Sequence, residues 1–190
     1  MSQDDDDFDP VQLPDEAQRI DAYRGEARWT RERFERLHGR AFLLMRRVQA
    51  ERAKRPARRI QTLIQELPAE SFRDLPPDRY LIFPLRKTER SLIERFYSVG
   101  QTRNNDVVIR DATVSKFHAY FQDDGSGGWL LQDAQSSNGT YVNEEAVPEQ
   151  DQGDPVPVRP GDRVRFGTVE LVLLDSEDFL SLLRQVHGGR

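Results

Sequence analysis

Two short polar clusters of this sequence combine side chains that could bind or react with a ligand. In the first, the hydroxyl of Ser115 stands next to the ammonium of Lys116. The second is the turn sequence Ser136-Ser137-Asn138-Gly139, which adds two hydroxyls and a side-chain amide. Donors of these kinds, carried on loops, can converge on a phosphate group. Neither cluster supplies an obvious nucleophile with a base beside it, so the chemistry they indicate is binding rather than bond making.

The two clusters belong to a longer series of short motifs. In chain order, the series is Gly100, then Asn105-Asp106-Val107-Val108-Ile109, then Ser115-Lys116 with His118-Ala119, then Asp133 with residues 136–143, then Pro160-Gly161-Asp162 with Phe166-Gly167. In order and spacing the series resembles the forkhead-associated (FHA) domain, over about half of the chain. The resemblance implies a β-sandwich that binds phosphothreonine on loops at one end.

The resemblance also implies roles for the binding residues. Ser115 matches the family serine that hydrogen-bonds the phosphate, and Lys116, at the next position, would supply charge. Ser137 and Asn138 match the loop pair that contacts the phosphate or the peptide backbone. Asn138 is the residue expected to hold the main chain of the ligand. In this family the threonine methyl fills a small pocket, so threonine would be preferred to serine.

Four further residues would support the site rather than contact the ligand. Gly100 matches a glycine that permits a tight turn, and His118 matches a histidine that buttresses the loop carrying the serine. Gly139 and Thr140 complete the turn after the second cluster. A lone histidine in a strand pattern is usually a scaffold group, which agrees with this assignment.

One position departs from the family pattern. The family commonly has arginine after the glycine, whereas this chain has Gln101. A hydrogen bond to a charged group contributes about 1.5–3 kcal/mol against about 1 for a neutral one. Losing the charge would therefore weaken phosphate binding by about tenfold or more. Arg103 or Arg110 could substitute for it, and an FHA domain that does not read phosphate stays an open alternative.

Short strand patterns separated by turn sequences fill residues 79–175, which predicts an antiparallel β-sandwich. Residues 176–187 follow with Ser176 as a plausible N-cap and an apolar stripe, which predicts a closing helix. The fold class we expect is mainly β: an antiparallel FHA-type sandwich with an N-terminal α-helical arm and a short C-terminal helix.

Residues 16–67 are rich in helix formers and predict that arm. The run Ala41-Phe42-Leu43-Leu44-Met45 is apolar on more than one face, so part of it must pack against something. Two fates stay open: docking on the chain's own sandwich, or pairing with a second copy or another protein. Gly39 could mark a bend or a break between two helices. Residues 68–78, with Pro76-Pro77, would be a linker.

Charge is distributed unevenly. Between Arg19 and Arg59 there are fourteen Lys and Arg residues against five Asp and Glu, although the whole chain has a net charge of -5. Residues 1–15 contain the run Asp4-Asp5-Asp6-Asp7 and predict a disordered acidic tail, which could solubilise the chain or fold back on the basic arm. No aromatic residues interleave with the basic cluster at 46–59, so nucleic acid is a minor alternative.

The sequence contains no nucleotide-binding loop and no metal-spaced set of His and Asp, so we expect a protein that is not an enzyme and uses no cofactor or metal. We expect a phosphothreonine-dependent adaptor that binds a threonine-phosphorylated protein downstream of a Ser/Thr kinase. The alternative is a phosphate-independent scaffold that interacts or self-associates through its helical arm. No apolar run is long enough to span a bilayer, and we expect a cytoplasmic location.

Overall fold

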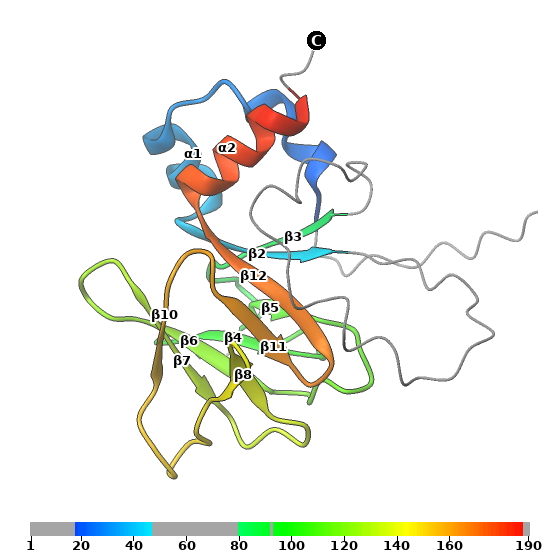
Figure 1. Cartoon of the computed structure of the whole chain (residues 1–190), viewed down its shortest axis with the longest axis vertical. Coiled ribbons are helices and arrows are strands. Elements are labelled where there is room, and N and C mark those ends of the chain that lie inside the picture. Colours follow the sequence, from blue (N-terminus) through cyan, green and yellow to red (C-terminus); the bar gives the residue numbers. More distant parts are fainter. Residues whose placement is uncertain (1–17, 47–79, 92, 188–190) are drawn as a thin grey trace, which may run out of the picture.

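The computed structural model describes residues 18–46, 80–91 and 93–187, with the side chain of Arg46 excepted. Two β-sheets form a sandwich, and a layer of helices covers the outer face of the larger sheet (Figure 1). Within this part of the chain, no helix is both long and apolar enough to cross a bilayer.

The larger sheet has seven strands in the order β1-β3-β2-β12-β11-β8-β9, and every neighbouring pair is antiparallel. Its strands are β1 (Gln18–Arg19), β2 (Ala41–Arg46), β3 (Tyr80–Pro84), β8 (Thr140–Val142), β9 (Glu145–Ala146), β11 (Arg163–Phe166) and β12 (Val169–Asp175).

The smaller sheet has five strands in the order β10-β7-β6-β4-β5. Its strands are β4 (Tyr97–Gly100), β5 (Val107–Val108), β6 (Ala119–Asp123), β7 (Trp129–Asp133) and β10 (Val156–Val158). The β4–β5 pair is parallel, whereas the other pairs of this sheet are antiparallel. The predicted antiparallel sandwich is therefore confirmed, with this one parallel pair added.

Two hydrophobic cores lie on opposite faces of the larger sheet. The inner core fills the sandwich and includes Leu43, Phe83 and Leu173 from one sheet and Phe121 and Leu131 from the other. The outer core lies between the sheet and the helices. Its buried residues are Ile20, Tyr23, Ala27, Phe34, Phe42, Leu44, Tyr80, Ile82, Phe179, Leu180, Leu182 and Leu183.

Three helical segments form the covering layer: the 3-10 helix η1 (Ile20–Glu26), α1 (Arg31–His38) and α2 (Ser176–His187). The α1 helix begins where the Thr30 hydroxyl accepts a hydrogen bond from the Arg33 amide at 3.4 Å. It ends at Gly39, whose φ of 93° lies in the left-handed region that glycine adopts at low cost. The helix therefore ends at Gly39 as the sequence indicated, but a strand follows it and not the second helix that was expected.

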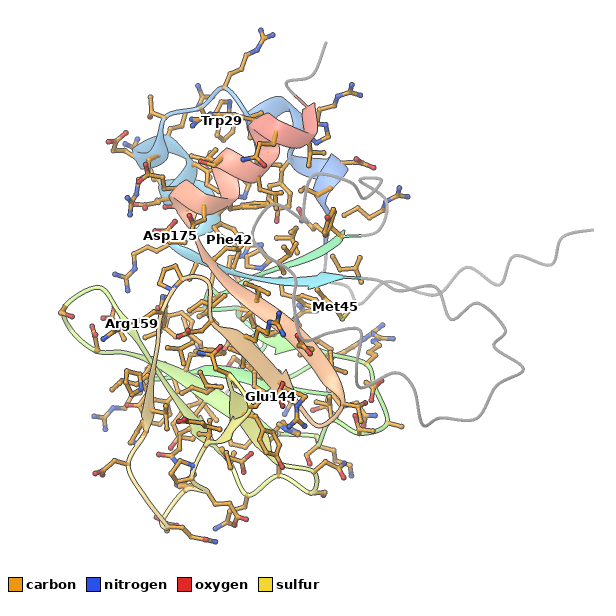
Figure 2. The ribbon with its side chains drawn as sticks, in the orientation of Figure 1. Trp29, Phe42, Met45, Glu144, Arg159 and Asp175 are labelled. Carbon is orange, nitrogen blue, oxygen red and sulfur yellow. The ribbon has the colours of Figure 1, made fainter. Side chains whose placement is uncertain are left out.

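The helical arm predicted over residues 16–67 is wrong for residues 41–46, which form strand β2 in the larger sheet. Along a strand, successive side chains point to opposite faces. Ala41 and Leu43 enter the inner core, and Phe42 and Leu44 enter the outer core. Figure 2 shows Phe42 just beneath the helices. Because both faces of β2 are buried, its apolar run lacks the alternation that would have marked it as a strand.

The sandwich therefore begins well before residue 79, since β2 supplies a central strand. Within residues 18–46, η1 and α1 pack on the larger sheet through the outer core, whereas β2 is part of the sheet itself. The acidic tail at 1–15, the rest of the arm and the linker at 68–78 lie outside the described residues. The closing helix is confirmed at 176–187, but its capping side chain is Asp175, which accepts from the Asp178 amide at 2.8 Å.

Candidate phosphopeptide-binding site

Strand register brings three loops to one end of the smaller sheet. Val99 in β4 pairs with Ala119 in β6, and Ala119 also pairs with Asp133 in β7. The end of β4, the start of β6 and the end of β7 therefore lie side by side. The segments 101–106, 109–118 and 134–139 extend from these strand ends, and they carry every residue that the sequence predicts to contact the ligand. Of the predicted supporting residues, Gly100 ends β4 and Thr140 begins β8.

Ser115 and Ser137 join two of these loops directly. The Ser137 amide donates a hydrogen bond to Ser115 Oγ at 3.0 Å, and the two hydroxyl oxygens are 3.5 Å apart. Ser137 is exposed and Ser115 is half-buried. The sequence-predicted pair of hydroxyls is therefore adjacent in space, and the Ser115 hydroxyl donates to Ser137 Oγ over this long distance.

His118 connects the same two loops from beneath. Its Nδ1 accepts a hydrogen bond from the Ser115 amide at 2.9 Å, and its Nε2 lies 3.1 Å from the Gly139 carbonyl oxygen. A carbonyl can only accept, so the Nε2 nitrogen carries the hydrogen and the ring is the neutral tautomer. Burial lowers the pKa of His118, although the Gly139 carbonyl and nearby Asp133 partly oppose this effect.

Asp133 shapes the turn that carries Ser137 and Asn138. Its carboxylate accepts from the Ser136 amide at 2.8 Å and from the Ser136 hydroxyl at 2.7 Å, and also from the buried Thr140 hydroxyl. The Ser136 hydroxyl in turn accepts from the Gly139 amide at 2.9 Å. The turn is therefore held by side chains at its base, which leaves its tip exposed.

Asn138 is exposed at the tip, and its Nδ2 donates to the Thr113 carbonyl at 2.8 Å. This bond ties the second cluster to the segment that leads into Ser115. It also fixes the orientation of the amide. Gly167 packs closely on Thr113 from the other side, because a Cβ at Gly167 would lie 2.5 Å from the Thr113 carbonyl oxygen.

The backbone of Lys116 is held by the loop that follows β4. Its carbonyl accepts from Asn105 Nδ2 at 2.7 Å and from Thr102 Oγ1 at 2.9 Å. Gly100 lies against the same carbonyl: a Cβ there would approach Lys116 O to 2.3 Å. Gly100 is therefore required by close approach rather than by an unusual φ. The Lys116 side chain is exposed.

Gln101 and Arg103 occupy different settings. Gln101 is half-buried, and its Nε2 donates to the Asp111 carbonyl at 3.0 Å, while its backbone amide donates to the Ser115 carbonyl at 2.9 Å. Its side chain thus braces the loop that carries Ser115. Arg103 is exposed on the neighbouring loop.

Sequence reasoning assigned no role to Lys87, which forms the only ion pair to a fully buried carboxylate among the described residues. Lys87 Nζ donates to Asp106 Oδ2 at 2.8 Å, to the Phe96 carbonyl at 2.8 Å and to Ser91 Oγ at 3.1 Å. Burial raises the pKa of Asp106, but hydrogen bonds from Lys87, Ser98 and Thr88 outweigh it and hold that pKa below its ordinary value.

Asp106 adjoins Asn105, so the Lys87 ion pair anchors the loop that holds Lys116. Asn105 and Thr113 were likewise not predicted as site residues. Asn105 lay within a recognised motif, but its role was not predicted. Its buried side-chain amide donates to the Lys116 carbonyl eleven residues away, and such a contact produces no periodic pattern in the sequence.

Comparison with known proteins agrees with this geometry. Residues 97–167 match the family model of the FHA domain. The chain is 39% identical over 77 residues to the glycogen accumulation regulator GarA of Mycolicibacterium smegmatis, covering 40% of this chain and 44% of that protein. The chain thus spans less than half the length of this relative.

Two solved structures are similar to part of the chain. The chain is 29% identical to Mycobacterium tuberculosis EmbR in complex with a low-affinity phosphopeptide, with a TM-score of 0.37, covering 42% of this chain and 20% of that one. It is 21% identical to the N-terminal FHA domain of S. cerevisiae Rad53p in complex with a phosphothreonine peptide, with a TM-score of 0.42, covering 53% of this chain and 88% of that one.

Proposed function

We propose that this protein binds a threonine-phosphorylated segment of a partner protein and does not act on it chemically. The observation that carries the proposal is the direct contact between Ser115 and Ser137, which unites the hydroxyl–cation cluster with the Ser-Asn-Gly turn. The match to the FHA family model supports the same ligand class.

In this proposal the phosphate lies above Ser115 and Ser137. The Ser115 hydroxyl donates to a phosphate oxygen, and the exposed Lys116 ammonium supplies charge. A hydrogen bond that involves an ionised group is shorter and about twice as strong as a neutral one. Asn138 contacts the ligand main chain through its Oδ1, because its Nδ2 is held by Thr113. Arg103 is the cation next along the neighbouring loop.

The proposed partner is the product of a Ser/Thr kinase, and the protein acts as an adaptor in the cytoplasm. In this proposal every residue of the site has a role in binding, and none acts as a nucleophile or as the base that would activate one. The N-terminal segments at 18–46 are part of the folded domain, so in this proposal they contribute to stability rather than reach the phosphopeptide.

The proposal is tested by titrating the protein with three matched peptide pools that carry phosphothreonine, phosphoserine or unmodified threonine. We expect binding of the phosphothreonine pool alone, at micromolar dissociation constants that correspond to about -8 kcal/mol. Equal binding of the unmodified pool, or binding of none of the three by folded protein, would overturn the proposal.

One observation favours a second candidate, a phosphate-independent scaffold. Gln101 replaces the arginine common in the family, and its amide is engaged by the Asp111 carbonyl. A site without that charge could bind protein through its loops without reading phosphate. Partner binding that survives phosphatase treatment would favour the scaffold over the phosphopeptide reader.

A further inference from the structure

The N-terminal helical segments have an outer surface that the phosphopeptide site does not use. Their inner faces are buried in the outer core through Ile20, Tyr23 and Phe34. Their outer faces are basic. In Figure 1, α1 and α2 lie at one end of the molecule and β8, which follows the Ser137 turn, lies toward the other.

The basic surface has an apolar and aromatic centre. Arg33, Arg36 and Leu37 are all exposed at spacings of three and four residues, so they share one face of α1. Leu37 is 53% exposed and is the one large hydrophobic side chain so exposed in the described part of the chain. The Arg33 guanidinium lies 4.2 Å from the centroid of the half-exposed Trp29 ring. We call Trp29, Arg33, Arg36 and Leu37 the α1 stripe.

The two arginines of the α1 stripe differ from the neighbouring Arg31 and Arg40, whose charges are neutralised by the folded domain. Arg31 pairs with Glu35 and Glu177, and Arg40 pairs with Asp123. By contrast, within residues 18–46, 80–91 and 93–187, Arg36 has no carboxylate partner, and Arg33 contacts the Trp29 ring instead of an acid. Exposed Arg24 and Arg28 extend the positive surface, whereas the exposed acids of η1 and α1 are Asp21, which pairs with Arg19, and Glu32.

The complementary segment is the chain's own N-terminus. Residues 1–17 contain seven acidic residues and no Lys or Arg. Within them, Phe8 is flanked by Asp7 and Asp9, after the run that begins at Asp4. The carboxylates around Phe8 are opposite in charge to the guanidiniums around Leu37. Phe8 and Leu37 are each an apolar side chain at the centre of a charged group, so the two segments are complementary.

The tail is also tethered close to this surface. Asp9 lies nine positions before Gln18, where β1 begins, and an extended chain over nine steps reaches about 30 Å. The η1 helix follows β1 directly, and both η1 and α1 contact α2. The eight residues of α1 span only about 12 Å. A short tether gives an effective concentration in the millimolar range, so contacts that are weak individually can be populated.

We propose that residues 4–9 dock on the α1 stripe, with Phe8 against Leu37 and Trp29 and the aspartates beside Arg33 and Arg36. Docking neutralises a cationic surface that would otherwise attract acidic partners. Because exposed ion pairs are weak and screened by salt, the docked state is reversible and depends on ionic strength.

The test uses the absence of cysteine from the chain. The full-length Ser2→Cys variant is labelled with a nitroxide, and the paramagnetic broadening of each backbone amide signal is measured by NMR. At low salt we expect the strongest broadening outside the tail at residues 29–37. We expect it to disappear at about 1 M salt, where the Debye length is about 3 Å.

Two variants place the contact. Arg33→Gln with Arg36→Gln should abolish the broadening, whereas Arg95→Gln with Arg159→Gln removes the same charge from exposed positions elsewhere and should leave it intact. Unchanged signals from the two cores would show that each variant is folded. A further sample mixes labelled protein with isotope-enriched unlabelled protein to detect docking between molecules.

Three outcomes would overturn the proposal. Broadening centred on Ser115, Lys116 and Asn138 would place the tail in the phosphopeptide site instead. Broadening that appears in the mixed sample would assign the contact to a second copy of the chain. No broadening beyond the tail, at any salt concentration, would mean that the α1 stripe does not bind residues 4–9.

Discussion

The Ser137 amide donates a hydrogen bond to Ser115 Oγ at 3.0 Å, although the two residues are 22 positions apart in the sequence. His118 lies beneath this contact and binds the backbone of both loops. The spacing between the two hydroxyls is therefore set by the fold before any ligand arrives, which lowers the ordering cost of binding.

Substitution of His118 should separate the two loops. We expect His118→Ala to destabilise the domain by about 2–4 kcal/mol, because it removes a buried ring and leaves the Ser115 amide and Gly139 carbonyl without partners. Phosphopeptide affinity should fall even at temperatures where the variant is folded. Urea unfolding measures the loss of stability, and titration with a phosphopeptide measures the loss of affinity. Wild-type stability of His118→Ala would contradict the role of His118 in joining the two loops.

Stability should also depend on pH through His118. Because burial lowers its folded pKa, the unfolded chain binds a proton near the ordinary value of about 6.5 while the folded chain does not. The contribution of His118 is thus fully present above that value and is lost as pH falls from about 6.5 toward the lower folded pKa. Urea unfolding at a series of pH values should show this loss in wild type and not in His118→Ala; identical profiles would refute it.

Gly100 should not tolerate a side chain. A Cβ would approach the Lys116 carbonyl to 2.3 Å, so Gly100→Ala must displace the backbone that carries Ser115 and Lys116. We expect at least a tenfold loss of phosphopeptide affinity. Gly25→Ala is the matched control, because a Cβ there meets no atom within 4 Å. Calorimetric titration of both variants checks the expectation, which fails if the two bind alike.

Lys87 should matter for stability although it lies outside the binding clusters. In Lys87→Met, the buried Asp106 carboxylate keeps its hydrogen bonds from Ser98 and Thr88 but loses its cation. We expect a cost of about 1–3 kcal/mol, below the usual range for a buried pair because Lys87 is partly exposed. Thermal unfolding measures it. Exposed Arg95→Met serves as the comparison, and an equal effect of both changes would argue against the ion pair.

The two faces of β2 should be equally important. Phe42 is buried in the outer core and Leu43 in the inner core, each with 0% of its surface exposed. Truncation of either residue to alanine should cost about 2–5 kcal/mol. Denaturant unfolding of the two variants tests the strand assignment, since a helix with one buried face would leave one of these neighbouring side chains dispensable.

Much of the site could be predicted because its parts are local. Ser115-Lys116 and the Ser136–Gly139 turn are short motifs, and residues such as Ser, Asn and Gly favour turns for known physical reasons. Their meeting in space depends on strand register, which the resemblance to a known family implied and the hydrogen bonds now specify. Gln101 was harder, because an amide can serve a ligand or a neighbouring carbonyl, and only the structure places it on Asp111.

Strand β2 and the contacts between loops could not be predicted in the same way. Residues 41–46 lie between two hydrophobic cores. A strand buried on both faces and a buried helix both give an unbroken apolar run in the sequence, so the run could not distinguish between them. The anchoring of Lys116 by Asn105, and of Asp106 by Lys87, depends on side chains that meet across loops. Such contacts leave no periodicity for sequence reasoning to detect.

The central claim is that the Ser115–Ser137 junction receives a phosphate. The most direct test is an NMR titration of isotope-labelled protein with one phosphothreonine peptide and its dephosphorylated twin. For the phosphorylated peptide we expect amide shifts to concentrate at Ser115, Lys116, Ser137, Asn138 and Gly139, and for the dephosphorylated twin we expect none. Shifts that are the same for both peptides, or that map away from these two loops, would contradict it.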